Sequence, residues 1–121
     1  MSVAVLDVSA SRFGSGPYLS ARRVAELLGV TLSELAGLVG VARNTLASDA
    51  GARKADAALS PLVRILAMAG EMAGGDERAA LWFKHQPIPG WGGKTAYDLV
   101  REGKAEKVLA YLEAVRSGVY A

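Results

Sequence analysis

The segment at residues 90–95, GWGGKT, carries the residue types closest to a chemical motif. A glycine-rich turn that ends in Lys-Thr before a helix can hold phosphate groups through its backbone amides and its lysine. The full phosphate-loop pattern is absent, because Ile88 stands where a glycine is required and no predicted strand leads into the turn. We therefore interpret the segment as a tight turn in which Thr95 caps the next helix. A nucleotide-dependent enzyme is the alternative that the sequence supports least.

Nucleophilic and metal-assisted catalysis also lack their usual residues. The chain has no cysteine, and His85 is its only histidine, with no serine and acid arranged around it as in a catalytic triad. A lone histidine at the end of a predicted helix is most often structural, and carboxylates that could replace it as metal ligands do not cluster in the sequence. We expect a protein that is not an enzyme and that uses no cofactor, metal or small-molecule substrate.

Aromatic residues and the chain end point towards binding. Trp82, Phe83 and Trp91 surround a Pro-Ile-Pro turn. Aromatic residues in such places usually belong to the core, but tryptophan is also enriched in binding hot spots. The apolar, aromatic residues 118–121 directly follow a predicted helix. An end of this kind is either a frayed terminus or a segment that inserts into a partner.

Residues 31–46 have the build of a DNA-binding helix-turn-helix. Small Ala36 allows close helix packing, Gly40 can form the turn, and apolar Leu46 can pin the second helix to the first. The same apolar spacing serves any small bundle of three packed helices, so a bundle with a solvated outer face stays open as an alternative.

The helix-turn-helix geometry would present polar side chains on one outer surface. Arginine and asparagine can read guanine and adenine edges, and nearby basic residues can bind phosphates. Acidic Asp49, at the end of the predicted recognition helix, opposes DNA binding, so we expect affinity to depend on dimerisation. The predicted DNA-binding residues are Arg43, Asn44, Thr45, Ser48, Arg53 and Lys54.

Start and stop signals divide the chain into helices. Thr31 and Glu34 have the spacing of a capping box, and Ser60 with Pro61 supplies an N-cap and a first-turn proline, the strongest start signal in the sequence. We predict helices over residues 20–28, 32–39, 42–48, 60–73 and 76–85, a sixth helix between Thr95 and Gly103, and a last helix that ends at Gly118.

Composition limits the class of protein. The hydrophobic fraction is 51%, and its large share of alanine and leucine favours an all-α fold. Fourteen basic against twelve acidic residues leave a net charge of +2, which does not by itself indicate a nucleic-acid-binding protein. No apolar run approaches the ~20 residues of a membrane span, and residues 1–10 lack the basic start of a signal peptide. We expect a soluble, cytoplasmic protein without a membrane partner.

The back half of the chain, about residues 60–121, resembles the toxin-binding domain shared by Xre, ParS and MbcA antitoxins. The pattern is a helix with tryptophan, a proline-containing loop, a Gly-Gly-Lys/Arg-Thr/Ser turn before a short helix, and a helix that ends in Gly-Val and an aromatic residue. The residues that carry the resemblance are Trp82, Phe83, Pro87, Gly92, Gly93, Lys94, Thr95, Leu99, Gly103, Val108, Leu109, Leu112, Gly118, Val119 and Tyr120.

The resemblance implies a partner. It implies an antitoxin of a bacterial type II toxin–antitoxin system that binds a RES-domain toxin, an ADP-ribosyltransferase-like protein that consumes NAD or modifies a metabolic enzyme, and covers its active-site cleft. It also implies a homodimer that represses its own operon through operator DNA. The toxin-binding residues carried over are Gly118, Val119, Tyr120 and Ala121, with Glu113 and Arg116 on the helix before them.

These inferences predict three parts in one all-α chain. Residues 1–19 form a mobile arm, residues 20–59 an Xre/Cro-like helix-turn-helix domain, and residues 60–121 a small helical toxin-binding domain packed with it. The alternative is a stand-alone helix-turn-helix transcription regulator whose back half serves only for dimerisation.

Overall fold

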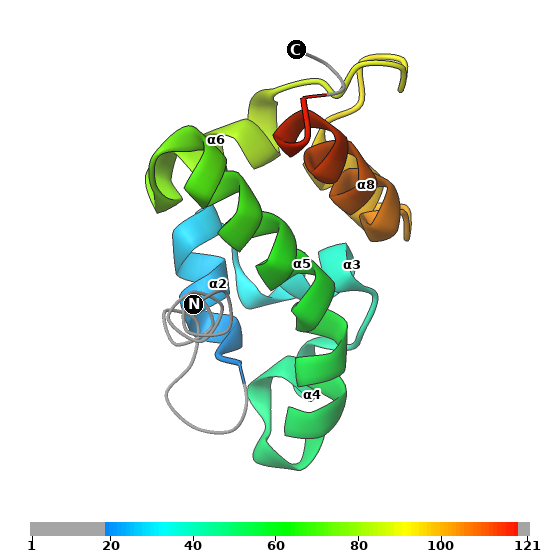
Figure 1. The fold of residues 1–121 in the computed structure, drawn as a ribbon. Helices are drawn as coiled ribbons and strands as arrows, with labels where there is room; N and C mark the ends of the chain where they lie inside the picture. Colours follow the sequence, from blue (N-terminus) through cyan, green and yellow to red (C-terminus); the bar gives the residue numbers. More distant parts are fainter. Residues whose placement is uncertain (1–18, 119–121) are drawn as a thin grey trace.

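The computed structural model describes residues 19–118, and within this range the chain is all-helical (Figure 1). The predicted arm at residues 1–19 lies outside the described residues except for its last residue. The elements are α2 (Ala21–Leu28), α3 (Leu32–Val39), α4 (Arg43–Ala47), the short 3-10 helix η1 (Asp49–Gly51), α5 (Ala52–Ala73), α6 (Asp76–His85), α7 (Ala96–Arg101) and α8 (Ala105–Arg116).

The start of α3 follows the sequence signal. The backbone N–H of Glu34 donates to Thr31 Oγ1 at 3.0 Å, and the Glu34 carboxylate accepts from the Thr31 backbone N–H at 2.9 Å. The predicted capping box is therefore confirmed. The Ser20 side chain caps α2 in the predicted way, and Gly29 ends that helix with a positive φ of 67°.

The predicted helix start at Ser60 and Pro61 is wrong, because α5 begins eight residues earlier and carries Pro61 in its interior. Proline costs a helix one backbone hydrogen bond, here the one to the carbonyl of Ala57, but Ala57 is exposed and its carbonyl can bind water. Ala55 and Leu59 are buried on the same stripe as the core residues that follow. Burial of this stripe outweighs the local start signal.

A single core joins the front and back halves. Helix α5 runs through the middle of the molecule and packs against α6 and α8, while α2 contacts α6 and α3 contacts α7 (Figure 1). Buried residues of the core come from six helices and the loop after α6, among them Leu28, Leu35, Leu66, Phe83, Ile88, Leu99 and Val108. The predicted division between residues 59 and 60 lies within α5 and stays a prediction.

Helices α6 and α7 are joined through aromatic packing. The Phe83 side chain is fully buried, and its ring meets the Tyr97 ring edge-on, with centroids 5.9 Å apart and planes at 68°. Such T-shaped pairs stabilise a core beyond the area they bury. The prediction that α6 runs from Asp76 to His85 is confirmed. Because Phe83 is buried near the end of α6, the start of the following loop is held at the core.

Helix α4 is the least buried of the α-helices. It spans five residues, none of them buried, and it is one residue shorter at each end than predicted. It lies close to the start of α5, because a Cβ atom on Gly51 would stand 2.6 Å from the Thr45 carbonyl oxygen. The absence of a side chain at Gly51 thus permits the approach of α4 to the rest of the fold.

Candidate functional site

The loop between α6 and α7, residues 86–95, is closed by its own backbone. Pro87 and Thr95 form an isolated antiparallel bridge, and the Ile88 backbone N–H donates to the Lys94 carbonyl at 2.8 Å. The Ile88 side chain is 2% exposed and anchors the loop in the core. The loop is therefore a pre-ordered element on the surface, as the interpretation of a tight turn predicts.

The tip of this loop presents Trp91 among glycines. Gly90, Gly92 and Gly93 have φ values of 87°, 63° and 88°, which L side chains rarely adopt. Trp91 itself is half-buried and packs partly against the core. The prediction that the aromatic residues belong to the core holds fully for Phe83, whereas Trp91 also retains a surface on the outside.

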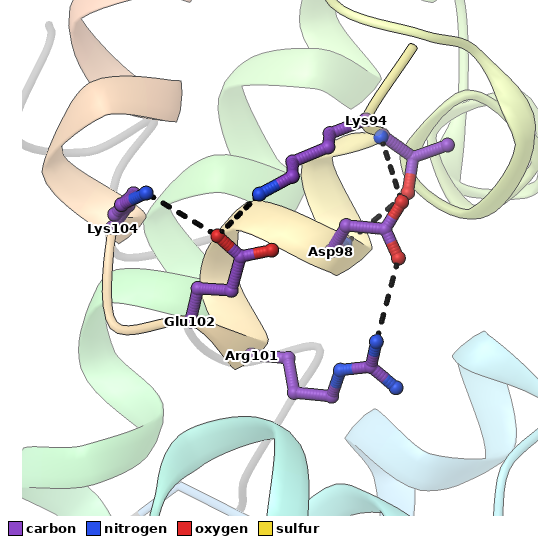
Figure 2. Close-up of polar contacts among 6 residues, drawn as sticks. Lys94, Asp98, Arg101, Glu102 and Lys104 are labelled. Atoms are coloured by element: carbon purple, nitrogen blue, oxygen red, sulfur yellow. Dashed lines mark hydrogen bonds and ion pairs between the residues drawn. The ribbon is translucent and has the colours of Figure 1, made fainter. Parts of the chain in front are cut away.

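Figure 2 shows that Lys94 turns towards Glu102, which lies at the end of α7. The Lys94 ammonium is 2.8 Å from Glu102 Oε1, and the Lys104 ammonium is 3.2 Å from the same oxygen. Hydrogen bonds from Lys94 and then Lys104 hold the pKa of Glu102 below its ordinary value. One carboxylate thus joins the loop to the residue that precedes α8.

Lys104 has a second contact in this cluster. Its ammonium lies 5.5 Å from the centre of the Trp91 ring, within the range of a cation–π interaction. Glu102 therefore positions the cation that covers Trp91. We name Trp91, Lys94, Glu102 and Lys104 the loop cluster.

A capping box orders the start of α7 beside this cluster (Figure 2). The Thr95 backbone N–H donates to the Asp98 carboxylate at 3.0 Å, and the Asp98 backbone N–H donates to Thr95 Oγ1 at 3.2 Å. The hydrogen bond from the Thr95 backbone N–H to the carboxylate, followed by a hydrogen bond from the Thr95 side chain, lowers the pKa of Asp98. The predicted capping role of Thr95 is confirmed.

The end of α8 carries part of the predicted toxin-binding set. Glu113 and Arg116 are exposed and form an ion pair at 2.6 Å. Gly118 is exposed, with a positive φ of 87°, and it follows a last turn in which the Ser117 hydroxyl donates to the Ala114 carbonyl at 3.0 Å. The other members of the set, Val119, Tyr120 and Ala121, lie outside the described residues.

The predicted DNA-binding residues share one stretch of the surface around α4 and the first turn of α5. All are exposed except Thr45, which is half-buried. The Ser48 side chain accepts a hydrogen bond from the Gly51 backbone N–H at 3.3 Å and so caps η1. The Ser48 hydroxyl is therefore exposed and also has a structural role as a helix cap.

Sequence reasoning missed Glu102 and Lys104. The pattern Lys94, Glu102, Lys104 contains a carboxylate between two ammonium groups, but eight residues separate the first pair. Lys94 and Glu102 come together only because α7 packs beside the loop. The turn at Gly103, which was predicted, is the one signal that Glu102 and Lys104 are placed at a helix junction.

Other kinds of site find little support in the part of the chain that is described. Between residues 19 and 118, no group of three or more His, Asp or Glu side chains is arranged to hold a metal ion. No single helix in this range is long and apolar enough to cross a membrane; the pair Asp49–Ala73 and Asp76–His85, bent by 112°, meets that test only when taken together.

Fold and site define an all-helical protein with a pre-ordered surface loop beside a C-terminal helix. Residues 68–118 match the family model of the antitoxin Xre/MbcA/ParS C-terminal toxin-binding domain. This segment runs from the later half of α5 to the end of α8 and lies within the range predicted from the resemblance. The match covers 51 of the 121 residues, and over this segment the chain is similar to that toxin-binding domain. No curated protein and no solved structure gives a match to the chain.

Proposed function

We propose that this protein is an antitoxin that neutralises a RES-domain toxin by placing residues 118–121 in the active-site cleft of the toxin. The family match over residues 68–118 carries this proposal, because the matched family domain is a toxin-binding one and the match ends at the first residue of the proposed segment. In this function the protein is a cytoplasmic, bacterial binding protein without catalytic activity of its own.

The packing of α8 supports occlusion as the mechanism. Val108 and Leu112 are buried, and α8 packs against α5, so the helix that leads to the segment is already formed. A short tail on a preformed helix loses less conformational entropy on binding than a free peptide does. Burial of one large side chain such as Tyr120 can then contribute about 1.5–3 kcal/mol from its area.

Deletion of residues 118–121 tests this function. We expect the truncated protein to keep its helical circular dichroism but to lose both binding to a co-expressed RES-domain toxin and protection of cell growth. The matched control is Glu106→Gln, an exposed change at the opposite end of α8, which should leave both unchanged. A truncated protein that still binds and protects as well as the full chain would show that these residues do not occlude the toxin.

We further propose that the protein forms a homodimer and represses its own operon through the surface around α4. Arg43 and Asn44 are exposed there, and Arg53 and Lys54 are exposed on the first turn of α5. Side chains of these types read base edges and bind phosphates respectively. A dimer would double the basic surface that a single chain with a net charge of +2 can offer.

A double variant separates DNA binding from toxin binding. Arg43→Ala with Asn44→Ala should weaken binding to the operator DNA upstream of the gene by about tenfold or more, since each lost base contact costs ~1–3 kcal/mol. Toxin binding should be unchanged. Tight operator binding by a chain that binds no toxin at all would instead favour a stand-alone transcription regulator whose back half only dimerises.

A further inference from the structure

Glu102 occupies a junction rather than the middle of a helix. It follows the last residue of α7, and Gly103 and Lys104 complete the turn into α8. Its Oε1 atom accepts from Lys94 at 2.8 Å on one side and from Lys104 at 3.2 Å on the other (Figure 2). The carboxylate therefore connects two segments that are ten residues apart in sequence.

The loop cluster restrains the side chains of this loop more than it restrains the loop backbone. The backbone is fixed by the Pro87 and Thr95 bridge, by the hydrogen bond from Ile88 to Lys94, and by burial of Ile88. Trp91 has no such restraint on its outer face beyond the Lys104 ammonium, 5.5 Å from its ring centre. Removal of the Glu102 carboxylate would thus release Lys104 and uncover the outer face of the ring, while the core contacts of the ring and the loop backbone stay in place.

We propose that Glu102 is a positioning residue for toxin binding: by holding Lys94 and Lys104 together, it keeps Trp91 in the orientation in which the ring contacts the toxin. This inference rests on the proposed function, because it assigns the loop cluster to the same toxin-binding surface as the end of α8. The partner surface that fits this cluster has an apolar pocket for the Trp91 ring. Carbonyl or carboxylate oxygens at the edge of the pocket would accept hydrogen bonds from the ammonium protons of Lys94 and Lys104 that do not bind Glu102.

The loop cluster contributes little to the stability of the fold. The side chains of Lys94, Glu102 and Lys104 are 44%, 32% and 41% exposed, and ion pairs with this exposure add little to folding. A fixed tryptophan, by contrast, is a favourable anchor for a partner, because its ordering does not have to be achieved during binding. The proposal therefore separates an effect on binding from an effect on stability.

The experiment compares Glu102→Gln with Glu106→Gln in a Trp82→Phe background, so that Trp91 is the only tryptophan. Both changes remove one negative charge from an exposed glutamate, but Glu106 has no hydrogen bond or ion pair with the described residues. Acrylamide quenching measures the exposure of Trp91, and calorimetry measures binding to a purified, catalytically disabled RES-domain toxin. We expect Glu102→Gln to increase quenching and to weaken binding about fivefold to tenfold, with the unfolding midpoint nearly unchanged.

The remaining outcomes each have a separate meaning. Unchanged quenching in Glu102→Gln overturns the positioning role, even if binding weakens, because Glu102 would then act as a direct contact. Increased quenching with unchanged toxin binding also overturns it, since the ring would not contact the toxin. If the parent protein with Glu102 does not bind the toxin, the proposed function itself fails. Lys104→Met, which removes the cation from the ring, should reproduce the quenching of Glu102→Gln.

Discussion

Two short surface elements that carry candidate contacts, helix α4 and the loop of residues 86–95, are built in different ways. Helix α4 presents Arg43 and Asn44 from five residues of which none is buried. The loop of residues 86–95 presents Trp91 from a backbone that is bridged, hydrogen-bonded and anchored by fully enclosed Ile88. Both expose polar or aromatic side chains, but of the two only the loop is anchored by a buried side chain of its own.

The difference indicates how each element can bind. A restrained loop can offer the same surface to a partner each time, so binding there loses little entropy. An element with few buried contacts unfolds locally at a low cost in free energy. We therefore expect α4 to become fully ordered when it binds its target. The contrast predicts that substitutions in the loop affect folding strongly, while those in α4 affect folding weakly and binding more.

The largest expected effect comes from Ile88→Ala. Because the Ile88 side chain is 2% exposed, its truncation leaves a cavity, and we expect the free energy of unfolding to fall by about 2–5 kcal/mol. Leu46→Ala in α4 removes a half-buried side chain and should cost clearly less. Urea unfolding of both variants measures the difference. Equal losses would show that α4 is packed as firmly as the loop.

Gly51 tests the contact that holds α4 in place. A Cβ atom there would stand 2.6 Å from the Thr45 carbonyl oxygen, so Gly51→Ala must displace backbone and should destabilise the protein by about 1–3 kcal/mol. Gly37→Ala is the matched control, since an added Cβ on this exposed helical residue meets no atom within 4 Å. That change should stabilise the protein by about 0.5–1 kcal/mol. The same sign for both variants in thermal unfolding would contradict the assignment.

The two capping boxes provide an internal comparison of the front and back halves. Thr95→Ala removes the side-chain acceptor for the Asp98 backbone N–H and should cost ~1 kcal/mol, and Thr31→Ala removes the same acceptor at the start of α3 with a similar result. Serine at either position should restore most of the loss. We expect a single cooperative unfolding transition in each variant, because one core joins both halves. Two separate transitions in calorimetry would divide the chain into independent units.

The smallest effect is the dependence of stability on pH. Hydrogen bonds hold the pKa of Glu34 below 4.5, that of Asp98 below 3.8 and that of Glu102 below 4.5. A carboxyl whose pKa is lowered by folding contributes stability above its unfolded value, and this contribution is lost as the pH falls through the folded value. The melting temperature should therefore decline only below about pH 4.5. In Asp98→Asn the decline should be shallower; an unchanged slope would remove Asp98 from the explanation.

The sequence predicted helix ends where local chemistry decides them. Thr31 with Glu34 and Thr95 each placed a helix start correctly, because a cap is formed by residues within one turn of each other. The pair Ser60 and Pro61 failed for the opposite reason. Burial of Leu59 against distant helices decides the start of α5, and a local pattern does not contain those contacts.

The candidate site was predictable only in part. The turn at residues 90–95 was located from its glycines, and the family model matches residues 68–118, within the range of the resemblance. The role of Lys94 was not predictable, because its partner Glu102 comes close only through the way in which α7 packs beside the loop. Motifs of neighbouring residues can be found in sequence, whereas a cluster assembled from separate segments requires the fold.

The length of α5 has a consequence for any assembly that contains this protein. Twenty-two residues at ~1.5 Å each make a rod of about 33 Å, which starts beside the residues proposed to meet DNA and ends at the turn into α6. A rod of this kind acts as a fixed spacer. A partner bound at one end of α5 is therefore held at a set offset and angle from a partner bound at the other end.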